Sequence, residues 1–221
     1  MSLDLLSAFL IGLAGAVHCI GMCGGIAGAF SFAIPKDKAP LPFHLSYNFG
    51  RIFSYTIAGA IAGYLGSVAD ARISTQIPVL NILSAVFLLL MGLFIGQWWM
   101  GLSMLEKAGG RLWKRLSPIG KHLIPFKNPL YSFAYGGIWG WLPCGLVYSA
   151  LVWSMSAGNA LNGASVMFMF GLGTFPALLS AGIGSQTLKP ILQKNIVRQI
   201  TSFSLIFIAL YLLFNILTSN N

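Results

Sequence analysis

Apolar residues in this chain come in blocks long enough to cross a lipid bilayer, and this limits its fold more than any other feature. A transmembrane helix needs about 20 predominantly apolar residues. Only 8% of the residues are charged, whereas a soluble domain carries roughly 25%. We therefore predict an all-α integral membrane protein with a single domain over residues 1–221. Its six predicted spans are 5–33, 47–67, 78–100, 130–155, 161–184 and 199–217.

The basic residues divide between the predicted loops by parity. Twelve of the 13 lysines and arginines fall on or beside the first, third and fifth loops, and the second loop holds only Arg72. Arg51 is counted beside the first loop, and the basic third loop covers about 101–129. Cytoplasmic loops carry such an excess, so we expect a bacterial inner-membrane protein with both termini outside. His44 and His122 are expected at the surface of these loops.

The net charge of +9 does not indicate a nucleic-acid partner. A nucleic-acid patch would gather on one surface and would not follow the parity of membrane loops. The expected surroundings are the lipid bilayer.

Glycine and proline recur at corresponding places in two halves of the chain, about 1–100 and 130–221. With three spans each, the halves must have opposite orientations, so the predicted fold is two inverted three-helix repeats. Interrupted helices at matching positions of such repeats indicate a central site, and spans one and four are predicted to be interrupted. Alternatively, small residues only let helices pack closely. The predicted helix-breaking residues are Gly24, Gly25, Pro143, Gly145 and Pro176.

The three cysteines, Cys19, Cys23 and Cys144, all lie inside predicted spans. Each alone could serve as a small apolar residue, but Pro143 loosens the helix beside Cys144. Cys19 and Cys23 are four residues apart, so in a regular helix their Cβ atoms lie about 5–6 Å apart, beyond the reach of a disulfide. A Cys19–Cys23 bond would require a broken helix, whereas a Cys23–Cys144 bond needs only that spans one and four touch, and we favour that pair. A thiolate there would need water or a helix N-terminus to stabilise it.

A second hypothesis concerns metal binding at the same place. His18, Cys19, Met22 and Cys23 lie within about one and a half helical turns. Imidazole and soft sulfur ligands select Cu(I), so with Cys144 they could form the site of a copper or other soft-metal transporter. Such a transporter would serve the maturation of a metalloenzyme such as a respiratory oxidase. Alternatively, His18 bonds a backbone carbonyl and Met22 fills a gap in the packing.

Two motifs resemble a known family. His18 to Gly25 reads H-C-x-x-M-C-G-G, and Gly140 to Gly145 reads G-W-x-P-C-G. Together with Arg51 and the run Gly171 to Pro176, they resemble the transmembrane region of the DsbD/CcdA cytochrome c biogenesis proteins. The resemblance is strongest to the branch often labelled sulfite exporter (TauE/SafE) or urease accessory (UreH-like), and it covers nearly the whole chain.

The resemblance implies an activity. Cys23 and Cys144 would form a reversible pair that carries reducing equivalents from a cytoplasmic thioredoxin-like donor to a thiol or metalloprotein acceptor outside. The protein would then be a thiol–disulfide oxidoreductase that requires no cofactor. The reductase branch usually has Pro-Cys-x-x-Pro where this chain has Met22 to Gly25. The branch label itself suggests a third hypothesis, a small-anion exporter.

Overall fold

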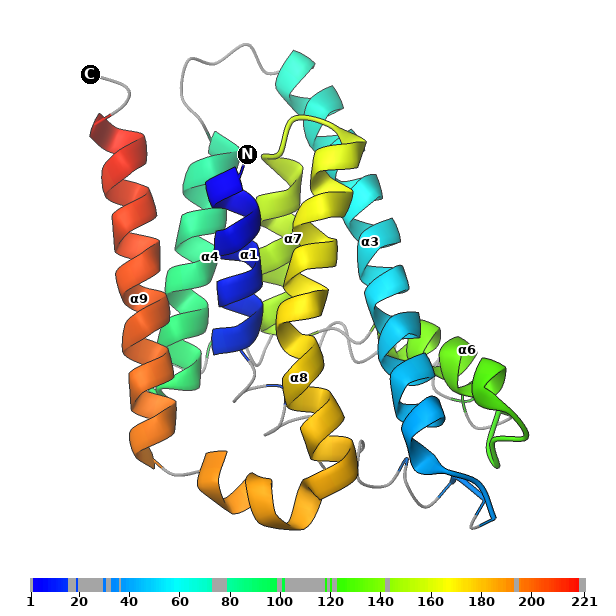
Figure 1. Ribbon diagram of the computed structural model, residues 1–221. Coiled ribbons are helices and arrows are strands. Elements are labelled where there is room, and N and C mark those ends of the chain that lie inside the picture. The colour runs from blue at the N-terminus through cyan, green and yellow to red at the C-terminus, as the bar shows by residue number, and fades with distance from the viewer. Residues whose placement is uncertain are drawn as a thin grey trace.

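In the computed structural model, the regular secondary structure of the described residues is entirely helical (Figure 1). The described residues are 2–15, 19, 30, 33–35, 37–72, 79–98, 101, 118, 120, 123–141, 144–192 and 195–218. Their helices are α1 (Ser2–Ala14), α3 (Pro40–Arg72), α4 (Val79–Ile95), α6 (Pro129–Trp139), α7 (Gly145–Met155), α8 (Ala160–Leu192) and α9 (Asn195–Thr218).

The helices form a bundle in which both chain ends lie at the same end (Figure 1). The long helices α3 and α8 pack against each other, α4 packs against α9, and α1 lies against α8. The short helix α6 packs on the half of α3 farthest from the chain ends. The bundle therefore brings segments from both halves of the chain into one core.

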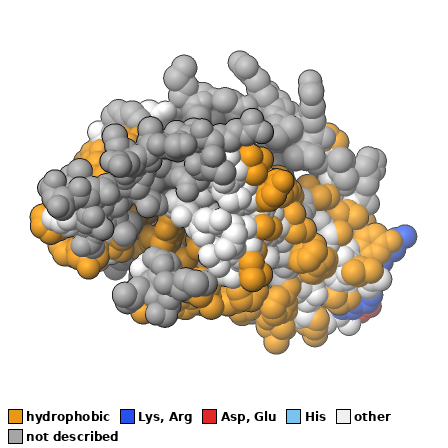
Figure 2. Space-filling view, turned by 90° about the horizontal axis from the view of Figure 1, so that it is seen from above, with side chains coloured by type: hydrophobic (Ala, Val, Ile, Leu, Met, Phe, Trp, Pro, Cys, Tyr) orange, Lys and Arg blue, Asp and Glu red, His pale blue; other side chains and the backbone are white. Residues whose placement is uncertain are grey.

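Two of the described helical segments are long and apolar enough to cross a membrane, Pro40–Ala69 and Ala160–Gly182. Shorter apolar helices cover Leu5–Ala14, Gly145–Met155 and Ser202–Tyr211. Large apolar side chains stand exposed on these helices, including Phe53, Leu161 and Phe207. Figure 2, which looks onto one end of the bundle, shows hydrophobic side chains among the described residues. A surface of this kind is suited to lipid, where apolar side chains need not be buried inside the protein.

Glycines bring the helix backbones close together. A Cβ added at Gly12 of α1 would lie 3.1 Å from the Cα of Gly173 in α8. Between α3 and α8, a Cβ added at Gly163 would lie 2.9 Å from the Cα of Gly63. Small residues at helix interfaces allow this approach in membrane proteins. The glycine-rich pattern in these segments therefore serves packing.

The helix α3 begins earlier than the sequence analysis expects. Its first residue is Pro40 rather than residue 47, and proline fits a helix start because its missing N–H needs no partner there. As a result, His44 and Arg51 lie within α3, and only 2% and 3% of their surfaces are exposed. The prediction that His44 lies at the surface of a loop was wrong, whereas Arg51 lies in the second predicted span, as expected, but is buried. His122 lies outside the described residues.

The predicted helix break at Pro176 was also wrong, because α8 continues through this residue. Proline removes one backbone donor, but a membrane helix tolerates this loss where neighbouring groups or a local adjustment re-satisfy the backbone. The fourth predicted span, in contrast, consists of two helices, α6 and α7.

Candidate functional site

Four of the predicted site residues lie in the described part of the chain. They are Cys19, Cys144, Gly145 and Pro176. The relative positions of Cys23 and Cys144, and the arrangement of the metal-binding set, therefore stay predictions. The predicted residues outside the described ranges are His18, Met22, Cys23, Gly24, Gly25 and Pro143.

Cys144 lies at the interruption between α6 and α7. The first of these helices ends at Trp139, and the second begins at Gly145. Cys144 is the N-cap residue of α7, with an extended backbone at φ −118° and ψ 148°. Its carbonyl accepts the first bond of that helix, from the N–H of Tyr148, at 3.1 Å. Cys144 therefore lies at the positive end of a helix dipole, which favours negative charge.

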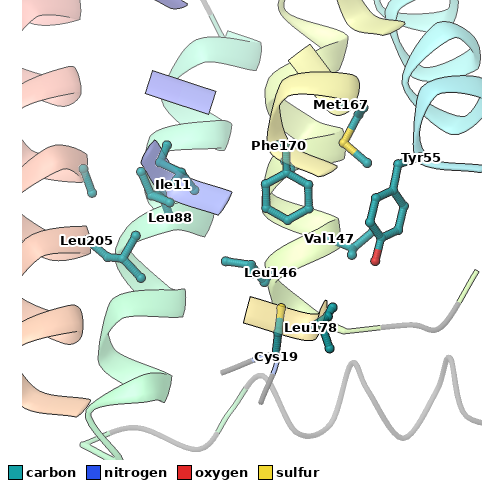
Figure 3. Packing of buried hydrophobic residues seen from close by; sticks show 12 residues of the cluster. Ile11, Cys19, Tyr55, Leu88, Leu146, Val147, Met167, Phe170, Leu178 and Leu205 are labelled. Atoms are coloured by element: carbon teal, nitrogen blue, oxygen red, sulfur yellow. The ribbon is translucent and has the colours of Figure 1, made fainter. Parts of the chain in front are cut away.

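Cys19 lies in the apolar core that the two halves share. It is 9% exposed and belongs to the same buried cluster as Ile11, Leu146 and Leu178. Figure 3 shows its sulfur beside Leu146 and Leu178. Cys144 is partly buried and packs against this same cluster. The fold thus gathers one cysteine from each half of the chain in one core.

A second group of polar residues surrounds Arg51 in the same core. Its guanidinium donates hydrogen bonds to Asn48 Oδ1 at 3.2 Å, to the Tyr55 hydroxyl at 3.3 Å and to the Thr174 hydroxyl at 3.2 Å. The Thr174 hydroxyl in turn donates to the carbonyl of Gly171 at 2.9 Å. A network in which each member has a partner holds its side chains in one arrangement.

Among the described residues, the hydrogen-bond acceptors of the Arg51 guanidinium are all neutral. Its acceptors are an amide and two hydroxyls. The guanidinium also lies 5.3 Å from the ring centroid of Tyr55 and 6.0 Å from that of Tyr47. Ring faces attract cations, but an isolated buried charge still carries a large desolvation cost. A charged residue at this depth is a functional-site candidate.

Tyr55 connects this polar group to the cysteines. Its side chain belongs to the buried cluster that includes Cys19 and against which Cys144 packs. The Arg51 group therefore borders the apolar core in which Cys19 lies and on which Cys144 packs.

Sequence reasoning missed this group because it counted Arg51 with the loops. The signal was present in the spacing. Asn48 and Tyr55 stand three residues before and four residues after Arg51, which puts all three on one face of a helix. The predicted span 47–67 already contained all three residues. Thr174 belongs to a motif that the sequence analysis noticed, but its contact with Arg51 depends on the tertiary packing of α3 on α8.

The metal hypothesis gains no support from the described residues. Within the ranges that the structure describes, no group of three or more His, Cys, Asp or Glu side chains could hold a metal ion. Three of its five predicted ligands lie outside those ranges.

Residues 7–211 match the family described as the cytochrome c biogenesis protein transmembrane region. No curated protein and no solved structure matches the chain significantly. The match is to the family as a whole and assigns no branch within it, so the sulfite-exporter label stays a prediction. Because the match covers nearly the whole sequence, this chain belongs to the cytochrome c biogenesis protein transmembrane-region family.

Proposed function

We propose that this protein passes reducing equivalents across the membrane by thiol–disulfide exchange between Cys23 and Cys144. The observation that carries the proposal is the position of Cys144, which caps α7 at the break in the fourth predicted span and packs against the shared core. Membership of the cytochrome c biogenesis family supports a role with thiol-redox partners.

The position of Cys144 suits the chemistry that exchange requires. A thiolate is the nucleophile in exchange and also the leaving group, and helix N-termini stabilise it. In the reductive step, a donor thiolate attacks one sulfur of the Cys23–Cys144 disulfide, and the other sulfur leaves as a thiolate. The second donor thiol then resolves the mixed disulfide. Two electrons and two protons pass from the donor dithiol to the cysteine pair.

We infer that six helical spans in two inverted repeats carry this pair. The packing supports the inference, because α1 lies against α8 as α7 lies against α3. Under the repeat, each of these contacts joins the first span of one half to the second span of the other. The partners α3 with α8 and α4 with α9 are likewise equivalent helices of the two halves. Chain ends at one end of the bundle fit an even number of spans (Figure 1).

The proposed orientation puts the basic loops in the cytoplasm of a bacterial cell and both termini outside. The first and third predicted loops meet at one end, where the Lys38 ammonium donates to the carbonyl of Lys127 at 2.6 Å. Under this orientation a thioredoxin-like donor would reach the pair from that end. The acceptor, a thiol or metalloprotein, would meet it from the other.

Thiol trapping with a maleimide mass tag tests the proposal. The purified protein would be tagged before and after incubation with reduced thioredoxin. We expect two thiols to become available after reduction in the wild type and in Cys19→Ser, which serves as the matched control. In Cys23→Ser or Cys144→Ser, reduced thioredoxin should make no additional pair of thiols available to the tag. A wild-type protein whose thiols are already reduced and ignore thioredoxin would contradict the relay.

The same samples also separate the relay from the copper hypothesis. A relay should bind no Cu(I) that depends on His18 and Met22, and His18→Ala should leave the exchange intact. Stoichiometric Cu(I) binding that His18→Ala abolishes, together with no thioredoxin reaction, would favour the metal transporter instead.

A further inference from the structure

The helix α8 has a proline near its middle, and glycines before that proline hold the helix to its neighbours. Pro176 gives no N–H to the preceding turn, and a helix bends most readily at such a residue. Before this point, a Cβ added at Gly163 would lie 2.9 Å from the Cα of Gly63 in α3, and one added at Gly173 would lie 3.0 Å from the Cα of Gly12 in α1. Backbones packed this closely leave the first part of α8 little room to move.

After the proline, α8 meets α3 through a side chain. A Cβ added at Gly182 would lie 2.5 Å from Nδ1 of His44, and the three atoms nearest to it all belong to that imidazole. Figure 1 shows α3 and α8 diverging toward the end farthest from the chain termini. The helix α3 is itself held by α6, since a Cβ added at Gly136 would lie 2.8 Å from the carbonyl carbon of Tyr47. The second part of α8 is therefore the partner that can move.

The face of α3 along this divergence is polar although it is buried. His44, Asn48 and Arg51 stand four and three residues apart, which puts them on one helix face, and all three are buried. The Asn48 amide donates to the carbonyl of His44 at 2.9 Å and accepts from Arg51 at 3.2 Å, and Arg51 also donates to Thr174 of α8 at 3.2 Å. Ionisable residues inside a membrane almost always face the bundle interior or a water-filled cavity. A polar face between two helices is suited to lining such a cavity when the helices separate.

The charge of Arg51 favours that separation. Its described hydrogen bonds go to neutral oxygens and use three of its N–H groups. A guanidinium carries further donors, and a buried charge keeps a desolvation cost that neutral partners do not remove. Water that reached this face would recover part of that cost. One turn farther along α3, Tyr55 belongs to the cluster that holds Cys19, so an opening here would lead toward that core.

We propose that α8 bends at Pro176, so that its part after the proline moves away from α3 and opens a water-filled entrance lined by His44, Asn48 and Arg51. The contact of His44 with Gly182 is released in this movement. The inference rests on the proposed function, in which a donor reaches the core from the end where the basic loops meet, and it assigns the place of entry.

Distances between spin labels in lipid nanodiscs test this opening. The entrance pair, Leu41→Cys with Ser180→Cys, spans α3 and α8 after the proline. The matched control pair, Leu65→Cys with Leu161→Cys, spans the same two helices before it. Leu41, Leu65 and Leu161 are exposed, and Ser180 lies four residues after the exposed Pro176, on the same helix face. The native cysteines are replaced in all these proteins, and pulsed EPR measures the distances.

We expect two distance populations for the entrance pair and one for the control pair. Pro176→Ala restores a backbone donor and should remove the longer population. Gly182→Ala puts a methyl group against the His44 ring and should raise the ratio of the longer to the shorter population by about fivefold or more, the factor that overpacking typically costs. His44→Ala makes room for that methyl group, so the Gly182→Ala/His44→Ala protein should return to near the wild-type ratio.

Two results would overturn the proposal. One is a single population for the entrance pair that is the same in the wild type and in Gly182→Ala. The other is a longer population that Pro176→Ala leaves unchanged, because the bend would then lie elsewhere. If Pro176→Ala does not fold, an equal ratio in Gly182→Ala and in the Gly182→Ala/His44→Ala protein would also overturn it. These proteins lack Cys23 and Cys144 and perform no exchange, so this test and the relay test can fail independently.

Discussion

The guanidinium of Arg51 in α3 donates a hydrogen bond to the hydroxyl of Thr174 in α8, across 123 residues of sequence. The bond joins α3 in one half of the chain to α8 in the other, and its neighbour Tyr55 belongs to the cluster that holds Cys19. A contact of this kind couples the packing of the two halves to the place where the thiol chemistry is proposed.

The first prediction concerns this bond and the stability of the bundle. Thr174→Val replaces the hydroxyl with a methyl group of similar volume, and hydrogen bonds between membrane helices contribute about 0.6 kcal/mol on average and about 1.7 kcal/mol at most. We expect a loss in that range in detergent-mediated unfolding. Thr174→Ser keeps the hydroxyl and should lose less. A Thr174→Val protein as stable as the wild type would show that the bond does not contribute.

The second prediction compares two neighbouring glycines of α6. A Cβ added at Gly136 would lie 2.8 Å from the carbonyl carbon of Tyr47 in α3, whereas one added at Gly137 meets only Ser54 Oγ at 3.7 Å. Gly136→Ala should destabilise the protein by about 1–3 kcal/mol, as overpacking does.

Gly137→Ala is the matched control for that experiment. It adds the same methyl group to the same helix without a clash, and alanine in a helix is favoured over glycine by about 0.5–1 kcal/mol. We expect thermal unfolding to occur at an unchanged or slightly higher temperature. If both variants unfold alike, α6 does not pack on α3 as described.

The third prediction concerns the start of α8. The side chain of Asn159 accepts a hydrogen bond from the N–H of Asn162 at 2.8 Å, which satisfies one unpaired donor at the beginning of the helix. Asn159→Ala should lower the free energy of unfolding by about 1 kcal/mol. Asn159→Asp keeps the acceptor and should be nearly neutral. Equal stability of all three proteins would contradict the cap.

The helical class and several helix positions could be predicted from the sequence, because long apolar blocks are visible in the order of the residues. Segments close to α4, α8 and α9 were expected near their observed bounds. The start of α3 was missed because the residues just after Pro40 are only moderately apolar. A span chosen by its apolar residues therefore begins later, at residue 47. His44 and Arg51 are buried by the helices that pack against α3. The residues next to them in the sequence do not predict this burial.

The candidate site could be predicted only in part. Pro143 and Gly145 predicted an interruption at Cys144, since proline and glycine weaken a helix locally, and here α6 ends at Trp139 and α7 begins at Gly145. The thiolate was expected to need water or a helix N-terminus, and the structure puts Cys144 at the N-cap of α7 without a hydrogen bond from its side chain to that helix end. The Arg51 group could not be assembled from sequence, because Thr174 joins it through a contact between distant helices.

The fourth prediction tests the orientation of the bundle. The test uses two variants in which the three native cysteines are replaced and one new cysteine is introduced. Asp37→Cys puts the thiol just before α3, at the end of the bundle where the basic loops meet. Ser156→Cys puts it between α7 and α8, at the opposite end. A membrane-impermeant maleimide added to intact cells should label Ser156→Cys and leave Asp37→Cys unlabelled until the membrane is opened. Labelling of Asp37→Cys from outside would reverse the proposed orientation.

The central claim is that electrons cross the membrane through Cys23 and Cys144, and transfer in proteoliposomes measures it directly. Reduced thioredoxin would be added outside vesicles that contain an entrapped redox-sensitive fluorescent protein in its disulfide form. We predict that the wild type and Cys19→Ser reduce the entrapped protein well above the rate of empty vesicles, while Cys23→Ser and Cys144→Ser do not. Equal reduction with all four proteins, or wild-type transfer no faster than with empty vesicles, would contradict the account.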